Sequence, residues 1–241
     1  MLETVRILHT SDIHLGSDYF EPRHPDNAAG AWLVEVVDLA EKAAVDLLIV
    51  AGDLFDSPRI SDSTVEFASE QFGKVSMPIV LLPGNHDCLV RESPYLMQSA
   101  FHGMPNIRTI VNPEGERMSF PHLDLAVWGR PHSDYSDFSP LEGVPERGSE
   151  RWQVAVAHGH YAAHGLGIQS WKITDADLEA SNMDYIALGH RETFSRVGRN
   201  GVAAYYSGSP QQTGAVVMAE LNIQTGIRVD QVSLDFPQGP T

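Results

Sequence analysis

Five short segments of this chain place carboxylate, amide or imidazole side chains directly after apolar runs of the kind that form strands. The segments are residues 11–14, 51–56, 83–87, 158–160 and 189–192. Their oxygen and nitrogen atoms are the ligands that divalent metal ions take from proteins when no thiolate is present. Loops at the carboxyl ends of strands converge in open α/β sheets. The sequence therefore predicts a metal site built from all five segments.

The first three segments offer the carboxylates. Asp12 and His14 are two residues apart, so strand geometry would direct both side chains to one ion. Gly52 permits a close backbone approach beside Asp53, whose carboxylate can bridge two ions. The turn at 83–87, Pro-Gly-Asn-His-Asp, sets an amide oxygen beside an imidazole and a carboxylate. Each segment alone also fits an ordinary capped loop, and their coincidence is what indicates metal chemistry.

The last two segments each deliver a histidine at a strand end. His158 follows the apolar run 154–157, and His190 follows 185–188 and a glycine. A single strand-end histidine usually packs in the core, so these two gain meaning only together with the other three segments.

In this order the segments resemble the pattern of calcineurin-like metallophosphoesterases, which reads D-x-H, G-D-x-x-D, G-N-H-D, H and G-H-x-H. The resemblance covers roughly residues 5–212, and segments 8–16 and 206–211 look like the SbcD-type DNA repair exonuclease branch. It implies an α/β fold, a layered αββα sandwich of two mixed sheets flanked by helices. It also implies two divalent ions, with manganese expected and iron or zinc as alternatives.

The resemblance carries over residue by residue. It implies a first ion on Asp12, His14 and Asp53, and a second ion that shares Asp53. The second ion's ligands are Asp53, Asn85, His158 and His190. Two ions about 3.5–4 Å apart lower the pKa of water and clamp phosphoryl oxygens during in-line attack.

The resemblance also implies a catalytic pair. His86 would stabilise the transition state or protonate the leaving oxygen. Asp87 would hold the other ring nitrogen of His86 and so fix its tautomer.

The last motif departs from the family pattern, because Glu192 stands where the pattern has a histidine. As a ligand, Glu192 would add a hard oxygen and favour manganese or iron. Without it, the first ion keeps three protein ligands. His160 or His164 could compensate from a neighbouring loop.

Three arginines flank the motif loops and could bind a phosphate bidentately, although surface arginines commonly pair with local acids. These predicted substrate-binding residues are Arg59, Arg91 and Arg191.

Composition narrows the classes of function. The 241 residues are 42% hydrophobic, so a single domain spanning 1–241 is expected, with no capping domain or ATPase-binding extension apparent. No leader and no membrane-spanning run is evident, which favours a cytoplasmic protein. Cys88 is the only cysteine, which excludes an internal disulfide and a thiolate zinc cluster. The net charge of −16 argues against a broad DNA-coating surface.

The pattern of elements supports the fold. In the first half, apolar runs at 5–8, 47–51 and 79–82 alternate with helix-period segments at 29–44 and 63–72. Ser63 and Glu66 form a capping-box pair in the second helix. The second half offers one helix and a long surface loop that could border a substrate site. Its expected elements are the helix 175–180, the loop 131–148 and strands at 123–128, 154–157, 185–188, 202–206, 215–221 and 227–234.

Three functional hypotheses follow. The leading one is a dinuclear-metal phosphodiesterase, an exonuclease-like hydrolase acting on DNA ends or short oligonucleotides, with an ATPase or a second copy as candidate partner. The second is a phosphatase or cyclic-nucleotide phosphodiesterase with a small substrate. The third is a non-catalytic binding module whose first metal site is degenerate.

Overall fold

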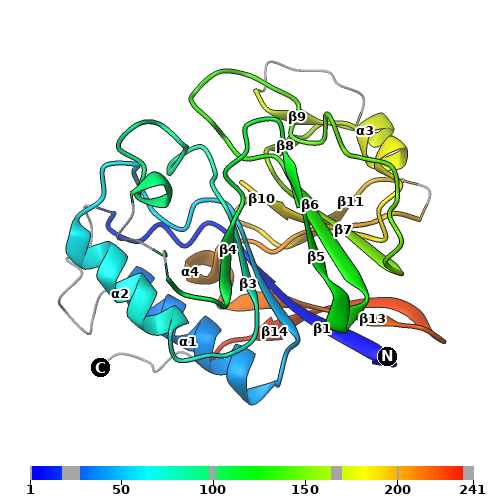
Figure 1. The fold of residues 1–241 in the computed structure, drawn as a ribbon, viewed down its shortest axis with the longest axis horizontal. Helices are drawn as coiled ribbons and strands as arrows, with labels where there is room; N and C mark the ends of the chain where they lie inside the picture. Colours follow the sequence, from blue (N-terminus) through cyan, green and yellow to red (C-terminus); the bar gives the residue numbers. More distant parts are fainter. Residues whose placement is uncertain are drawn as a thin grey trace.

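A computed structural model describes residues 2–17, 28–97, 101, 103–163, 170–199 and 201–235 of the chain. Two six-stranded sheets pack face to face, and helices cover their outer faces (Figure 1). The prediction of a layered αββα sandwich is therefore confirmed. No helix within these ranges has the length and apolar character needed to cross a membrane.

The first sheet holds the N-terminal half of the chain and its last two strands. From edge to edge its strands are β14 (Gly226–Ser233), β13 (Ala215–Asn222), β1 (Thr4–Thr10), β2 (Leu47–Ala51), β3 (Ile79–Leu82) and β4 (Ile107–Thr109). Strands β1 to β4 are parallel, and β13 and β14 join them antiparallel. The helices α1 (Ala28–Lys42) and α2 (Asp62–Phe72) follow β1 and β2, respectively, and pack on the outer face of this sheet.

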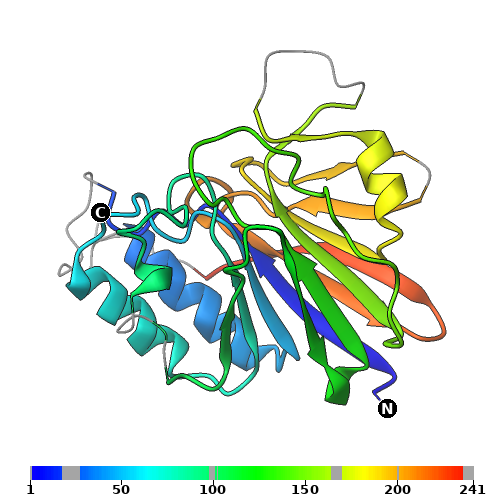
Figure 2. The same ribbon diagram turned by 45° about the horizontal axis from the view of Figure 1, so that its top comes forward.

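The second sheet holds most of the C-terminal half. Its strands run in the order β11 (Ser195–Val197), β12 (Ala203–Tyr206), β10 (Tyr185–Gly189), β7 (Trp152–His158), β6 (Leu125–Gly129) and β5 (Glu116–Phe120). The helix α3 (Asp175–Ser181) covers its outer face, as the turned view shows (Figure 2). The small elements are η1 (Pro94–Leu96), η2 (Pro121–Leu123), α4 (Pro210–Thr213) and the paired strands β8 (His160–Tyr161) and β9 (Lys172–Ile173).

Strand alternation divides the core into three layers. In β2, Ile49 points between the two sheets, whereas Leu48 and Val50 point toward α1 and α2. In β7, Val154 joins the layer between the sheets and Ala155 the layer under α3. Both faces of each central strand are buried, which explains the continuous apolar runs in the sequence.

The predicted elements recur with small shifts. The runs 47–51 and 79–82 match β2 and β3. Five strands were missed: β4, β5, β8, β9 and β11. The capping prediction for α2 was wrong in register. Ser61, two residues before Ser63, is the N-cap, and its hydroxyl oxygen accepts the Thr64 amide proton.

Candidate metal centre

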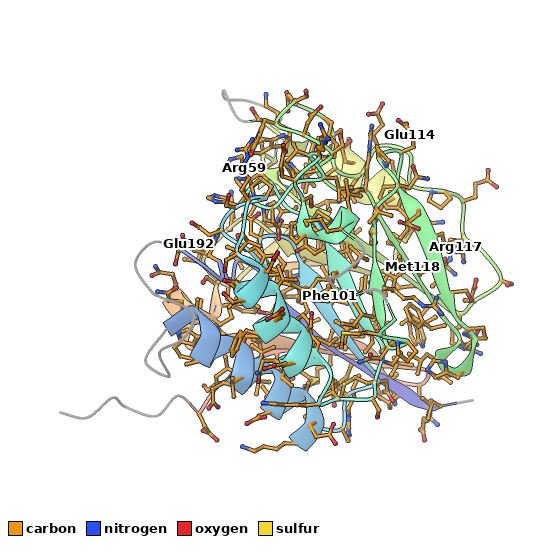
Figure 3. The ribbon with its side chains drawn as sticks, turned by 60° about the vertical axis from the view of Figure 1, so that its left-hand side comes forward. Arg59, Phe101, Glu114, Arg117, Met118 and Glu192 are labelled. Carbon is orange, nitrogen blue, oxygen red and sulfur yellow. The ribbon has the colours of Figure 1, made fainter. Side chains whose placement is uncertain are left out.

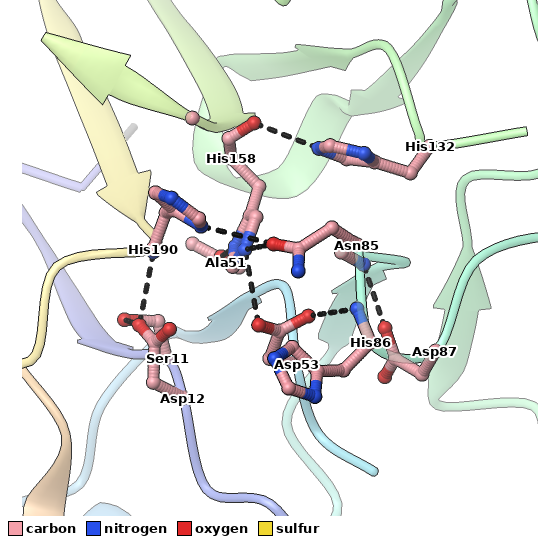
Figure 4. Close-up of polar contacts among 12 residues, drawn as sticks. Ser11, Asp12, Ala51, Asp53, Asn85, His86, Asp87, His132, His158 and His190 are labelled. Carbon is pink, nitrogen blue, oxygen red and sulfur yellow. Dashed lines mark hydrogen bonds and ion pairs between the residues drawn. The ribbon is translucent and has the colours of Figure 1, made fainter. Parts of the chain in front are cut away.

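The five segments meet at one edge of the sandwich, where β1, β2, β3, β7 and β10 end. The carboxyl ends of the parallel strands in both sheets open toward the same side, and β2 contacts both β7 and β10 across the layers. Figure 4 shows the side chains converging there. The sequence-predicted convergence is therefore present in the fold.

Strained backbone aims several of these side chains. The strand β1 ends at Thr10, so the predicted period-two geometry for Asp12 and His14 was wrong. Both residues have positive φ values of 55°, and the peptide group of Asp53 accepts the amide protons of Ile13 and His14. Four predicted ligands share a positive φ, and they are Asp12, His14, Asp53 and His190. Such backbone costs about 1–3 kcal/mol per residue and persists only where surrounding contacts enforce it.

One group of donors, here called the histidine pocket, consists of Asp53, Asn85, His158 and His190. The Nε2 atom of His158 lies 3.2 Å from Asp53 Oδ2 and 3.0 Å from Asn85 Oδ1. The Nδ1 atom of His190 lies 2.9 Å from the same Asn85 oxygen. Asp53 and His158 are buried, and His190 is partly buried. These four side chains can contribute two oxygens and two nitrogens to one ion.

The hydrogen bonds of His158 fit a metal ligand. Its Nδ1 atom faces the Ala51 carbonyl oxygen at 2.8 Å, and a carbonyl can only accept, so Nδ1 carries the proton. In the neutral ring, Nε2 then directs a lone pair at the oxygens of Asp53 and Asn85. That arrangement needs a proton or a cation between the atoms.

The pKa values of the two histidines also indicate that the pocket attracts a positive charge. Burial disfavours charge on His158, but the Asp53 carboxylate outweighs burial and raises the pKa of His158 to about 9. Burial and then the charge of His158 lower the pKa of His190 to about 3. A divalent ion bound among these groups would displace the proton that His158 otherwise holds.

A second group, here called the aspartate pocket, consists of Asp12, His14 and Asp53, whose donor atoms lie within 4.8 Å of one another. The Oδ2 atom of Asp12 accepts the Ser11 hydroxyl proton at 2.5 Å and the His190 amide proton at 3.0 Å. These two bonds leave Oδ1 of Asp12 for an ion. Asp53 belongs to both pockets, as a bridging carboxylate would.

The histidine next to the pockets has a different partner from the predicted one. The His86 amide donates to Asp53 Oδ1 at 2.9 Å, which ties its backbone to the shared carboxylate. Its Nδ1 atom lies 3.3 Å from the Asp56 carbonyl oxygen and 3.6 Å from the Asp56 carboxylate. The same carboxylate oxygen lies 3.2 Å from His14 Nδ1. Asp56 therefore faces both imidazoles.

The predicted pairing of Asp87 with the His86 ring was wrong. Asp87 is buried and accepts protons from the amides of Gly84 and Phe55, at 2.7 and 3.1 Å, and from the Tyr95 hydroxyl at 2.6 Å. Burial, followed by the charge of Asp53, raises the pKa of Asp87 to about 6. The turn directs the side chains of consecutive residues apart. Asp87 therefore stabilises the 83–87 loop through its bonds to backbone amides and does not contact the His86 ring.

Glu192 and two of the predicted arginines are exposed at the surface. The Glu192 side chain is exposed, and within the described ranges it joins no converging group of metal donors (Figure 3). Arg59 is exposed and lies 4.0 Å from Glu92, and Arg91 is exposed. Arg191 is partly buried and donates to the Tyr161 carbonyl oxygen at 3.1 Å. His164, the other suggested compensating residue, lies outside the described residues.

Sequence reasoning missed His132, from the 131–148 loop. This buried ring places Nε2 2.9 Å from the His158 carbonyl oxygen and packs edge-on against Trp171. The indole nitrogen of Trp171 in turn donates to the Ser136 carbonyl oxygen at 2.9 Å. The loop therefore does border the site, as expected. A histidine within a polar loop gave no pattern from which this contact could be inferred.

Comparisons with known proteins identify the family of this chain. The sequence profile described as calcineurin-like phosphoesterase matches residues 5–192. The DNA double-strand break repair protein Mre11 of Methanopyrus kandleri is 25% identical over 86% of this chain and 49% of its own length. The SbcD subunit of the SbcCD nuclease from Bacillus subtilis is 27% identical over 86% of this chain and 61% of its own length. The chain thus spans about half the length of the curated relatives it matches.

Solved structures support the fold. The protein TT1561 of Thermus thermophilus superposes with a TM-score of 0.60 and 14% identity, over 95% of this chain and 99% of its own. A putative 5'-nucleotidase from Staphylococcus aureus gives a TM-score of 0.58 and 16% identity, over 96% of this chain and 54% of its own.

Proposed function

Because the chain belongs to the calcineurin-like phosphoesterase family and is a metal-dependent phosphoester hydrolase, we propose that it cleaves phosphodiesters in nucleic acids or nucleotides with two divalent ions. The observation that carries this proposal is the sharing of one buried carboxylate, Asp53, by two groups of metal donors. Paired metal sites around a shared ligand are the arrangement that phosphoryl-transfer enzymes use.

The histidine pocket would hold one ion and the aspartate pocket the other. Oxygen and imidazole donors suit manganese, iron or zinc, and the carboxylates favour manganese. Two such ions supply acidified water and positive charge for the phosphoryl oxygens. The protein's own residues then orient the metal donors and supply a proton to the leaving group.

His86 is placed to supply the proton to the leaving group. Its ring is about half exposed at the mouth of the site, and Asp56 faces Nδ1, which leaves Nε2 for the substrate. A proton on Nε2 can stabilise the developing charge or pass to the leaving oxygen. The close approach of His14, with ring centroids 4.7 Å apart, holds His86 beside the aspartate pocket.

The substrate class rests on the relatives. Their names describe a DNA double-strand break repair protein and a nuclease subunit, which favours a phosphodiester substrate such as a DNA end or short oligonucleotide. An ATPase or a second copy of the chain is the proposed partner. The net charge of −16 favours the alternative, a small phosphate ester, because it repels long polyanions.

The test compares two substrates on one preparation. Metal-free protein is titrated with Mn²⁺, and hydrolysis of bis-p-nitrophenyl phosphate and of p-nitrophenyl phosphate is followed. We expect metal-dependent hydrolysis of the diester, at a higher kcat/KM than that of the monoester. Hydrolysis of the monoester alone would replace the proposal with the phosphatase, and no turnover with either would leave the binding module.

A further inference from the structure

His160 lies beside the histidine pocket and has no part in the mechanism above. Its Nε2 atom is 2.8 Å from Nε2 of His190, and the two rings meet edge to face with centroids 4.0 Å apart. At this distance one nitrogen must carry a proton and the other a lone pair, since two protons or two lone pairs would repel. The pair therefore links the tautomers of the two histidines.

The other nitrogen of His190 decides the direction of this bond. Its Nδ1 atom faces the Asn85 oxygen in the histidine pocket at 2.9 Å. An imidazole binds an ion only through an unprotonated nitrogen. If His190 binds through Nδ1, its proton must reside on Nε2 and be donated to His160.

We infer that His160 is a positioning residue that holds His190 in the tautomer with Nδ1 free for the ion in the histidine pocket. The inference rests on the proposed function, because it takes His190 as a ligand. Metal-binding histidines generally need an acceptor for their second ring nitrogen, and here that acceptor is another imidazole. Within the described ranges His160 belongs to no group of converging metal donors, so it acts through His190.

The backbone on both sides of His160 is fixed by one buried hydroxyl group. The Tyr206 hydroxyl donates to the Gly159 carbonyl oxygen at 2.6 Å and accepts the Tyr161 amide proton at 2.7 Å. The His160 amide itself donates to the Trp171 carbonyl oxygen at 3.0 Å. These three bonds fix the backbone from which the His160 ring projects.

Arg191 joins the same arrangement from the His190 side. It follows His190 directly, donates to the Tyr161 carbonyl oxygen and lies over the Tyr206 ring, 5.1 Å from its centroid. The residues next to His160 and His190 are thus tied to each other. This contact gives Arg191 a structural role beside the substrate-binding role predicted from the sequence.

The experiment measures metal affinity in the full chain, with Zn²⁺ competed by a chromophoric chelator. His160→Ala removes the acceptor, and we expect the Zn²⁺ affinity of the histidine pocket to fall about 10- to 100-fold. His160→Gln retains an acceptor oxygen and should recover part of that loss. The ion in the aspartate pocket should keep its affinity. His122→Ala, which removes an exposed histidine of η2, is the matched control.

A direct reading of the tautomer accompanies the titration. In zinc-loaded protein, ¹⁵N NMR of the imidazoles should show Nε2 of His190 protonated and Nδ1 shifted by the ion. Tyr206→Phe leaves both histidines in place but releases the backbone beside His160. It should weaken zinc binding in the same direction by a smaller factor, and it provides a test should His160→Ala fail to fold.

Unchanged zinc affinity in His160→Ala and Tyr206→Phe would overturn the inference, as would a protonated Nδ1 on His190. Complete loss of one ion in both His160 variants would also overturn it, because His160 would then be a ligand. A wild-type protein that binds no zinc or manganese would instead contradict the proposed function.

Discussion

The two pockets share Asp53 but differ in how firmly their other donors are held. In the histidine pocket, His158 is oriented by the Ala51 carbonyl and His190 by His160. In the aspartate pocket, Asp12 is oriented by Ser11, but the position that the family gives to a histidine is taken by the exposed Glu192. Donors that are oriented before binding lose less entropy when the ion arrives. The histidine pocket should therefore fill first, and the aspartate pocket should bind its ion more weakly.

Removal of the shared carboxylate should abolish the difference between the pockets. Asp53→Asn takes one charged ligand from each, so both ions should be lost. Because such ions contribute several kcal/mol to the transition state, diester hydrolysis should fall by about 10³-fold or more. Metal analysis and the diester assay measure the two effects. Asp230→Asn, on the surface of β14, is the control, and metal retention in Asp53→Asn would contradict the bridge.

Loss of the proposed acid should leave both pockets intact. His86→Asn should lower kcat by about 10²- to 10⁴-fold, the range for a positioned general acid. Both ions should bind with unchanged affinity, since His86 meets Asp53 through its backbone amide. Isothermal titration with Mn²⁺ checks this separation. Full activity in this variant would remove His86 from catalysis.

A smaller effect is expected from the residue that orients His86. Asp56→Asn keeps a side chain of similar size but removes the charge facing the rings of His86 and His14. We expect a 10- to 100-fold loss of kcat, because a partner that orients a working group has effects of about this size. Asp87→Asn would instead change thermal stability, and an equal kcat loss in both variants would argue against a specific role for Asp56.

The smallest effect is expected at Glu192, where the aspartate pocket lacks the histidine of the family pattern. Glu192→Gln should change Mn²⁺ affinity and diester hydrolysis by less than about two-fold, because exposed side chains with few contacts contribute little. Metal titration of this variant beside the wild type provides the check. Loss of the weaker ion would show that Glu192 turns inward to complete the aspartate pocket.

The layers could be predicted from the sequence, and so could the convergence of most of the candidate donor side chains. Fully buried strands such as β2 carry a continuous apolar pattern, and the candidate donors follow strand ends, which an α/β sheet brings together. The strands β4 and β11 have three residues each, which is too short for an alternating hydrophobic pattern to be recognised. Glu192 could be recognised as a departure, but its exposure depends on the path of the loop after β10.

The partners of the donors were harder to predict because they come from tertiary contacts. Asp87 follows His86 in sequence, yet the turn separates their side chains, and Asp56 from another loop faces the ring instead. His132 and His160 reach the site through loop packing that no local pattern encodes. Residue type and spacing predicted which atoms could bind ions, and the fold supplied the groups that orient them.

The central claim is that two unequal metal sites share Asp53, and anomalous diffraction tests it most directly. Crystals equilibrated with increasing Mn²⁺ concentrations would be measured near the manganese absorption edge. We predict one peak in the histidine pocket at low concentration, and a second on the other side of Asp53 at higher concentration, about 3.5–4 Å from the first. A single peak at all concentrations, or first occupancy of the aspartate pocket, would contradict the account.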